Sequence, residues 1–207
     1  MITLYHAKEC PFCARVRIVF GEKRVPYKSV EIDLNEPPEE VSRLNPRGLV
    51  PIIEENGFVV RESAIISEYL DDRFPEPSLM TWLPEKRAKI RLLIESCDAD
   101  FLGPYYRLRQ TRRAEEQEKA RDAIMPVLEY LSRELKGKKF LLGNFSMADI
   151  AFAPWMIVLD RLPGLGREQI PEPVAAWIEA LRSRETIGSD PYWQGLLARE
   201  EPLKRAG

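Results

Sequence analysis

Cysteine and histidine are scarce in this 207-residue chain, which has three cysteines and one histidine. So few cysteines, in an odd number, exclude a disulfide-stapled scaffold and predict a reducing, cytoplasmic environment. An excess of either charge is also missing, because 31 Lys and Arg residues stand against 33 Asp and Glu residues. This balance argues against a strongly basic nucleic-acid-binding protein.

Long apolar runs are absent as well. The longest, 150–159, has ten residues and contains Pro154, whereas a helix that spans a bilayer needs about 20. Residues 1–5 lack the basic start and the apolar stretch of a signal peptide. A hydrophobic fraction of 44% is nevertheless enough for a buried core in one large or two small domains. We therefore expect a soluble globular protein of the cytoplasm, without a membrane partner.

The first 76 residues combine strand and helix patterns. Short β-prone runs alternate with segments of helical spacing, and proline or glycine separates them. Asn56-Gly57 is typical of a hairpin turn. Strands are expected at 2–5, 27–34, 49–54 and 58–60, and helices at 11–23, 38–44 and 62–73. The order β-α-β-α-β-β-α predicts an α/β domain at 1–76.

The composition changes after the proline-rich segment 74–78, and no convincing strand follows it. Apolar residues with helical spacing occur at 90–101, 124–135, 147–159 and 174–181. Pro126 is expected to kink the second of these helices. We therefore predict a linker near 76–84 and an all-helical domain at 85–207.

Cys10-Pro11-Phe12-Cys13 is the strongest local indication of chemistry. It lies between a predicted strand and a predicted helix, so Cys10 would occupy a helix N-terminus, where free N–H groups and the helix dipole stabilise a thiolate. A thiolate there is suited to disulfide exchange, and Cys13 could then attack a mixed disulfide on Cys10. A metal half-site is the alternative, but His6 is the only histidine and no second ligand pair accompanies it.

Two other segments are candidates for binding a ligand beside Cys10. If Pro51 were cis, the Val50 backbone could pair with an extended peptide, although an ordinary edge-strand proline fits this segment equally well. Glu62-Ser63 precedes a predicted helix and could hold the charged end of a small peptide. Read alone, this step is more often a simple helix cap.

Several other reactive side chains are expected to be structural. Cys97 lies on an apolar helical stripe, as core thiols do, and His6 ends a strand that contains Tyr5. A local basic cluster is followed directly by three glutamates, so a solvated face is favoured there over a surface for nucleic acid or an acidic partner. The cluster consists of Arg107, Arg109, Arg112 and Arg113.

Taken together, these motifs resemble the glutathione transferase superfamily. The Cys10–Cys13 motif, 45–51 and 62–65 occur in that family's order and spacing, and 145–149 extends the match into the second domain. The active-site cysteine is similar to that of omega-class transferases and glutaredoxins. The resemblance implies a thioredoxin-like first domain, an all-α second domain, glutathione as co-substrate and a homodimer. Ser146 and Asp149 match the family's capping box and are given no catalytic role.

The resemblance also implies roles for individual residues. Cys10 would be the nucleophile that faces the glutathione sulfur, and Cys13 would be a second catalytic thiol. The implied glutathione-binding residues are Pro11, Phe12, Val50, Pro51 (in the cis form), Glu62 and Ser63. Tyr105, Tyr106 and Trp155 would line an apolar co-substrate pocket between the domains.

Three positions depart from the family pattern. Cys13 makes a dithiol motif where omega-class proteins usually keep one cysteine. The segment 35–37 lacks the basic residue that some relatives direct at the glycyl carboxylate of glutathione. Arg24 stands where glycine often ends the first helix, in a left-handed conformation that costs other residues about 1 kcal/mol.

The sequence therefore predicts an omega-like glutathione transferase that acts mainly as a thiol transferase. Segments 16–23 and 68–75 also resemble the stringent starvation protein A family, whose members bind bacterial RNA polymerase. That resemblance implies a non-catalytic adaptor as the alternative. The dithiol favours the enzyme, as does Glu76, which stands where that family keeps a histidine between two prolines.

Overall fold

The computed structural model of the chain describes residues 1–197. Its first part confirms the predicted order of strands and helices. The elements are β1 (Thr3–His6), α1 (Pro11–Lys23), β2 (Lys28–Glu31), α2 (Glu39–Leu44), β3 (Ile52–Glu55), β4 (Phe58–Arg61) and α3 (Ser63–Arg73).

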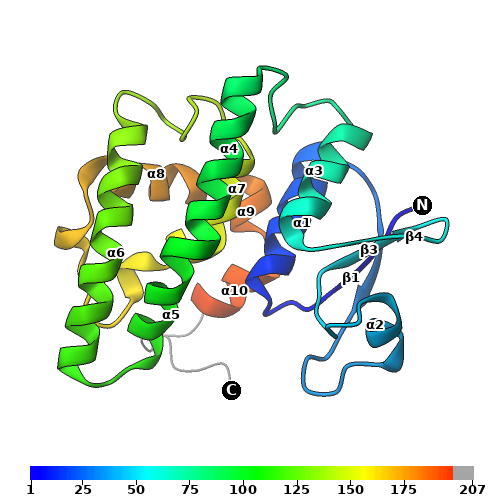
Figure 1. Cartoon of the computed structure of the whole chain (residues 1–207), viewed down its shortest axis with the longest axis horizontal. Helices are drawn as coiled ribbons and strands as arrows, with labels where there is room; N and C mark the ends of the chain where they lie inside the picture. Colours follow the sequence, from blue (N-terminus) through cyan, green and yellow to red (C-terminus); the bar gives the residue numbers. More distant parts are fainter. Residues whose placement is uncertain (198–207) are drawn as a thin grey trace.

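The second part is helical, and in the described residues beyond β4 the only β pairing is an isolated bridge between Leu142 and Asn144. Residues 198–207 of the predicted helical domain lie outside the described residues. Figure 1 shows the helices beside the N-terminal sheet, with α1 and α3 between the two. They are α4 (Pro84–Ser96), η1 (Cys97–Phe101), α5 (Leu102–Gln110), α6 (Ala114–Leu135), α7 (Met147–Met156), η2 (Leu159–Arg161), η3 (Arg167–Gln169), α8 (Glu172–Arg182), α9 (Glu185–Gly188) and α10 (Pro191–Leu197).

The sheet has the strand order β2-β1-β3-β4, with β1 parallel to β2 and antiparallel to β3. Alternate residues of β1 face opposite sides: Leu4 packs into the main core, and Tyr5 packs into a smaller cluster that includes Val41 of α2. The strand predicted at 27–34 was too long. Strand β2 ends at Glu31 because that residue pairs with His6, the last residue of β1.

Helix α1 is buried along most of its length, because it packs against α3 on one side and against α7 and α9 on the other. It begins at Cys10 and Pro11 and ends at Arg24, whose φ of 53° is left-handed as predicted for this position. Its buried residues include three cations, and each forms an ion pair with a carboxylate from another segment. The pairs are Arg15–Asp98, Arg17–Asp190 and Lys23–Asp71.

The predicted linker near 76–84 is fixed to the fold. Asp71 of α3 accepts hydrogen bonds from the backbone N–H groups of Leu79 and Met80, at 2.8 and 3.1 Å. Both of these residues are buried, and the carbonyl of Leu79 accepts the N–H of Met147 at the start of α7. The connection therefore contributes to the packing between the two parts.

The stripe predicted at 90–101 is one helical path, but it is not a uniform α-helix. Helix α4 ends at Ser96, and a π-helical turn, η1, leads into α5. A π-helical turn changes the direction of the following side chains and often occurs at functional sites. Pro126 lies inside α6, which continues on both sides of it.

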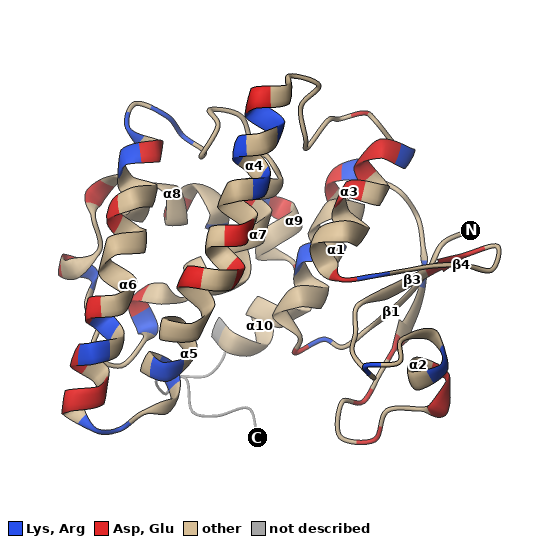
Figure 2. Ribbon diagram, viewed as in Figure 1, with Lys and Arg blue, Asp and Glu red and all other residues tan. Residues whose placement is uncertain are grey.

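Charged residues of both signs are mixed along α4 and α6 in the view of Figure 2. Neither sign dominates the helical face seen there, which agrees with the formal net charge of −2. In residues 1–197, no helix is both long enough and apolar enough to cross a bilayer.

Asp149 organises the start of α7 from a fully buried position. Its Oδ2 atom accepts hydrogen bonds from the N–H and the hydroxyl of Ser146, at 2.9 and 3.0 Å. Its Oδ1 atom accepts the backbone N–H of Leu141 at 3.0 Å and the indole N–H of Trp177 at 2.9 Å. Burial raises the pKa of this carboxyl to about 6, although the four hydrogen bonds oppose that shift. The capping box is thus also a link between α7 and α8.

Replacing Asp149 by alanine should lower the free energy of unfolding by about 3 kcal/mol or more, because four donors each lose an acceptor worth about 1 kcal/mol. Ser146→Ala removes a single capping side chain and should cost about 0.5–2 kcal/mol. Urea denaturation of both variants measures the two losses. Equal losses would mean that the links to Leu141 and Trp177 add nothing.

Candidate active site

Cys10 is the N-cap residue of α1, with φ −87° and ψ 117°, and Pro11 follows at the first helical position. Proline fits there because that N–H group has no partner inside the helix. The backbone N–H of Cys13 points at the Cys10 sulfur, with an N–Sγ distance of 3.4 Å. Cys10 is 9% exposed, and Cys13 is fully buried. The structure thus places Cys10 at the helix N-terminus, as the sequence predicted.

The two cysteines have pKa values shifted in opposite directions. A hydrogen bond from the Cys13 thiol lowers the pKa of Cys10 to about 7 against the effect of burial, with further help from backbone N–H groups and the charge of Arg17. Burial raises the pKa of Cys13 well above its ordinary value, and its hydrogen bond to Cys10 adds to that rise. Cys10 is therefore the better nucleophile of the pair, because the thiolate is the reactive form.

A pocket of about 400 Å³ opens beside Cys10. The Val50–Pro51 peptide bond on its wall is cis, and the Val50 carbonyl oxygen lies 4.0 Å from the Cys10 sulfur. Val50 precedes β3, whose pairing with β1 begins at Ile52, so its backbone is outside the sheet ladder. The lining residues are Cys10, Phe12, Leu34, Asn45, Arg47, Gly48, Leu49, Val50, Pro51, Glu62, Ser63, Ala64 and Asp98.

Glu62 and Ser63 lie on the same pocket, at the start of α3. Glu62 has a φ of 67°, a strained conformation for a residue other than glycine that is often found at functional sites. Its carboxylate accepts a hydrogen bond from Arg47 at 3.0 Å. Ser63 is the first residue of the helix, and its hydroxyl accepts a hydrogen bond from Arg15 at 3.4 Å. The site predicted from three separate motifs is therefore brought together around one cavity.

Sequence reasoning missed Arg15 and Asp98. The Arg15 guanidinium donates to Asp98 at 2.6 Å and to the Ala151 carbonyl at 2.9 Å, and it stacks over the ring of Trp155 with its carbon 4.7 Å from the ring centre. It thereby joins Ser63 in the first part to Asp98 on the π-helical turn of the second. One feature of the sequence could have indicated Arg15: it lies in a predicted helix between two apolar residues, Ala14 and Val16.

His6, Cys97 and Tyr5 are held in the fold by burial or hydrogen bonds, which agrees with the structural roles expected for them. His6 is buried between Arg17 and the Ser29 hydroxyl, and burial lowers its pKa to about 4, which keeps the imidazole neutral. Cys97 is fully buried, and burial raises its pKa to about 12. Tyr5 donates to Glu40 at 3.3 Å from the sheet face that α2 covers. Among residues 1–197, no group of three or more His, Cys, Asp or Glu side chains is arranged to bind a metal ion.

The three aromatic residues predicted to line a co-substrate pocket are near one another but are not equally accessible. Tyr105 and Trp155 are fully buried, and Tyr106 is half-buried. The indole N–H of Trp155 donates to the Tyr106 hydroxyl at 3.0 Å, and Trp155 makes an edge contact with Phe12. The prediction is therefore wrong for Tyr105 and Trp155, because fully buried side chains cannot line a co-substrate pocket. Tyr106 retains exposed surface, but it is not among the residues that line the pocket beside Cys10.

Comparison with known proteins gives a consistent result. A family model described as the N-terminal domain of glutathione S-transferase matches residues 4–78, and one for the C-terminal domain matches residues 95–185. A stringent starvation protein A homolog of Haemophilus influenzae is 34% identical over 199 residues, which cover 90% of this chain and 88% of that protein. Glutathione S-transferase omega-1 of Mus musculus is 31% identical over 166 residues, covering 78% of this chain and 68% of that protein.

Among solved structures, glutathione transferase Omega 3C from Trametes versicolor is similar, with a TM-score of 0.82 and 32% identity. The match covers 90% of this chain and 86% of that one. It extends over both the mixed sheet and the helical part, so it supports the α/β followed by all-α architecture as a whole.

Alkylation should distinguish the three thiols. Iodoacetamide near pH 6 should modify Cys10 first, because its lowered pKa leaves more thiolate there than an ordinary cysteine of pKa about 8.5 has. Mass spectrometry of the digested protein identifies the modified residue, and the rate measured from pH 5 to 9 should have its midpoint near the value of about 7 given above. Cys10→Ser should abolish the fast reaction. Preferential modification of Cys13 or Cys97 would contradict the assignment.

Proposed function

The chain belongs to the glutathione S-transferase family, and on that premise we propose that it is an omega-like thiol transferase with Cys10 as its nucleophile. One observation carries the proposal: a cysteine with a lowered pKa caps α1 at the mouth of a pocket beside Val50, Glu62 and Ser63. A cysteine thiolate favours exchange with disulfides over activation of the glutathione thiol, since both sulfurs would occupy the same position. Conjugation of bulky electrophiles should therefore be slow.

The proposed reaction reduces a glutathionyl adduct in two exchanges. The Cys10 thiolate attacks the glutathione sulfur of the adduct, the disulfide bond breaks, and the substrate leaves as a thiolate that takes a proton from water. Cys10 is then held in a mixed disulfide with glutathione. A second glutathione, as thiolate, attacks the glutathione sulfur of that mixed disulfide, releasing oxidised glutathione and restoring the Cys10 thiolate.

Cys13 offers a second route for protein disulfides. After Cys10 has formed a mixed disulfide with a protein, the Cys13 sulfur can attack Cys10, so that the reduced protein leaves and a Cys10–Cys13 disulfide forms. Two glutathione molecules then reduce this disulfide. The backbone contact between Cys13 and the Cys10 sulfur supports the proximity that this step needs. Its raised pKa keeps Cys13 protonated while Cys10 makes the first attack. In the second step the Cys13 proton passes to the departing protein thiolate.

The pocket offers chemistry suited to the γ-glutamyl and cysteinyl parts of glutathione. Ser63 and the free N–H groups at the start of α3 suit the γ-glutamyl carboxylate, and Glu62 suits its ammonium group. The Val50 backbone, outside the sheet ladder, suits pairing with the cysteinyl peptide, and Pro11 and Phe12 lie beside the thiol. Among the described lining residues Arg47 is the one cation, and its guanidinium donates to Glu62, so it would lie near the γ-glutamyl end. The glycyl carboxylate would then have no cation among these lining residues, in line with the missing basic residue at 35–37.

The relatives named stringent starvation protein A favour a second function, in which the same fold is a non-catalytic adaptor. RNA polymerase is the partner that the sequence resemblance implies for it. A homodimer and a cytoplasmic location are common to both proposals and come from the family likeness. The adaptor has no use for a thiol of lowered pKa, so Cys10 is the feature that separates the two.

A paired assay of Cys10→Ser and Cys13→Ser tests the proposed activity. Cys10→Ser should lose activity on a glutathionylated peptide and on a protein disulfide, because a hydroxyl cannot form the mixed disulfide. Cys13→Ser should keep the first activity and lose the faster release of protein disulfides, which needs a resolving thiol. If Cys13→Ser alone were inactive on both substrates, the roles would be reversed. A wild-type protein inactive on both would favour the adaptor.

Glutathione binding is tested separately with Ser63→Ala. The variant should bind glutathione more weakly by about 1–3 kcal/mol in calorimetry, because a charged ligand group loses its hydrogen-bond partner. Ser67→Ala is the matched control: Ser67 is also buried and lies one turn further along α3, where its hydroxyl donates to the Ser63 carbonyl. That control should leave the affinity unchanged. Equal affinity in both variants would remove Ser63 from the binding site.

A further inference from the structure

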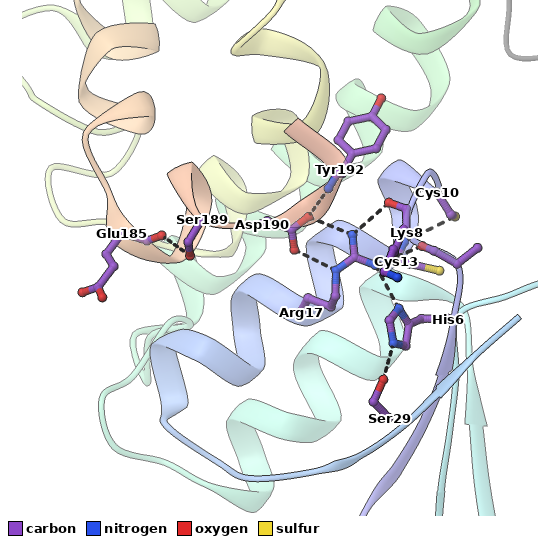
Figure 3. Close-up of polar contacts among 11 residues, drawn as sticks. His6, Lys8, Cys10, Cys13, Arg17, Ser29, Glu185, Ser189, Asp190 and Tyr192 are labelled. Atoms are coloured by element: carbon purple, nitrogen blue, oxygen red, sulfur yellow. Dashed lines mark hydrogen bonds and ion pairs between the residues drawn. The ribbon is translucent and has the colours of Figure 1, made fainter. Parts of the chain in front are cut away.

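Arg17 is the centre of a polar network beneath Cys10 (Figure 3). Its Nε and Nη2 atoms donate to the two carboxylate oxygens of Asp190, at 2.7 and 2.8 Å. Its Nη1 atom lies 3.1 Å from His6 Nδ1 and donates to the Ala7 carbonyl at 3.0 Å. Nη2 also donates to the Lys8 carbonyl at 3.3 Å. All five N–H donors of the guanidinium therefore have acceptors.

Two of these acceptors belong to the loop that leads from β1 to the thiol. The Ala7 carbonyl, which Arg17 holds, also accepts the backbone N–H of Cys10 at 3.3 Å. Ala7 packs against the side chains of Cys10 and Cys13. One hydrogen-bonded oxygen thus separates the guanidinium from the backbone of the nucleophile, in a region with little access to water.

Asp190, the ion-pair partner of Arg17, lies 173 residues further along the chain. It precedes α10, where its Oδ1 atom accepts the N–H of Tyr192 at 3.0 Å and its carbonyl accepts the N–H of Trp193. The side chains of Arg17 and Asp190 are 6% and 4% exposed, so water cannot readily replace either one. The carboxylate has two defined partners and a fixed place in the fold.

We propose that Arg17 is a positioning residue for the Cys10 thiol, with Asp190 orienting its guanidinium so that the 7–10 loop is held at the N-terminus of α1. The C-terminal helix would thereby determine the geometry of a nucleophile that lies in the other domain. The proposal rests on the proposed function only in taking Cys10 as the reacting group.

The Asp190→Asn variant separates two effects on the pKa of Cys10, because they have opposite signs. One comes from the charge of Arg17, and the other comes from the position of the 7–10 loop. If the loop stayed in place, the Arg17 cation would lose its counter-charge and would favour the thiolate, which lowers the pKa of Cys10. If the loop shifts, Cys10 loses its alignment with the N–H groups of α1 and its pKa rises. The other groups that face the thiol are Cys13 on α1, the neutral His6, Glu62 and Asp98 across the pocket, Tyr106 on α5 and Tyr192 on α10. Burial raises the pKa of both tyrosines above its ordinary value, so neither changes its charge between pH 5 and 9 in either protein.

The experiment measures the alkylation rate of Cys10 from pH 5 to 9 in the full-length protein, using iodoacetamide and peptide mass spectrometry. In Asp190→Asn the midpoint should move to higher pH, so that the thiolate fraction at pH 6 falls about three- to tenfold. An unchanged or lower midpoint would overturn the proposal. Because this readout needs no turnover, it is independent of whether the protein is a thiol transferase.

Glu22→Gln is the matched control. Glu22 also pairs α1 with the C-terminal helices, accepting from Arg184 at 2.6 and 3.0 Å, but it makes no contact with the 7–10 loop. The Glu22→Gln variant should leave the pH midpoint of Cys10 alkylation unchanged. An equal shift in both variants would mean that general loosening between the domains moves the thiol, and it would overturn the specific role of Arg17.

Arg17→Lys provides the second variant if Asp190→Asn does not fold at the temperature of the assay. Lysine keeps the buried positive charge opposite Asp190, but its three donors cannot replace the five that Arg17 directs at Asp190, His6, Ala7 and Lys8. The Cys10 midpoint should rise as in Asp190→Asn, whereas calorimetric affinity for glutathione should stay the same, since Arg17 does not line the pocket. A midpoint equal to that of the wild type would overturn the proposal.

Discussion

Three buried cations on one helix determine how the rest of the molecule is arranged around it. A buried cation without a partner is costly, and removing one member of such a pair typically costs about 3–5 kcal/mol. The carboxylates that meet Arg15, Arg17 and Lys23 come from η1, from the residue before α10 and from α3. Asp98 and Asp190 thus tie the helical part to α1 at two points, and any other docking orientation would have to break these two ion pairs.

The same helix creates two thiols with different reactivity from a single motif. Its free N-terminal N–H groups are available to Cys10, which sits at the cap, whereas Cys13 lies one turn inside, fully buried. Arg15 and Arg17 then contact different segments: Arg15 donates to the hydroxyl of Ser63, which lines the pocket, and Arg17 donates to the loop before Cys10. Two sides of the candidate site, the pocket residue Ser63 and the loop before Cys10, are thus both held by arginines of one buried helix.

Local patterns in the sequence predicted the features that depend on neighbouring residues. The bounds of α1 follow from Pro11 at its start and the chain reversal at Arg24, and the capping box at Ser146 could be read directly. The partners of Arg15 and Arg17 could not, because they lie 83 and 173 residues away and nothing near Asp98 or Asp190 indicates a pairing. The strand at β2 was overestimated for a related reason, since its length is set by β1 and not by its own residues.

The origin of Asp190 at the end of the chain has a consequence for recombination between relatives. A thioredoxin-like half grafted onto a foreign helical half would carry Arg15 and Arg17 with it but would leave both carboxylates behind. Such a chimera would have its cysteine motif and the Lys23–Asp71 pair intact, and still lack Asp98 and Asp190, the carboxylates that pair with Arg15 and Arg17. A unit that is moved between relatives therefore has to include the two acidic positions far downstream, and not only the domain that contains the motif.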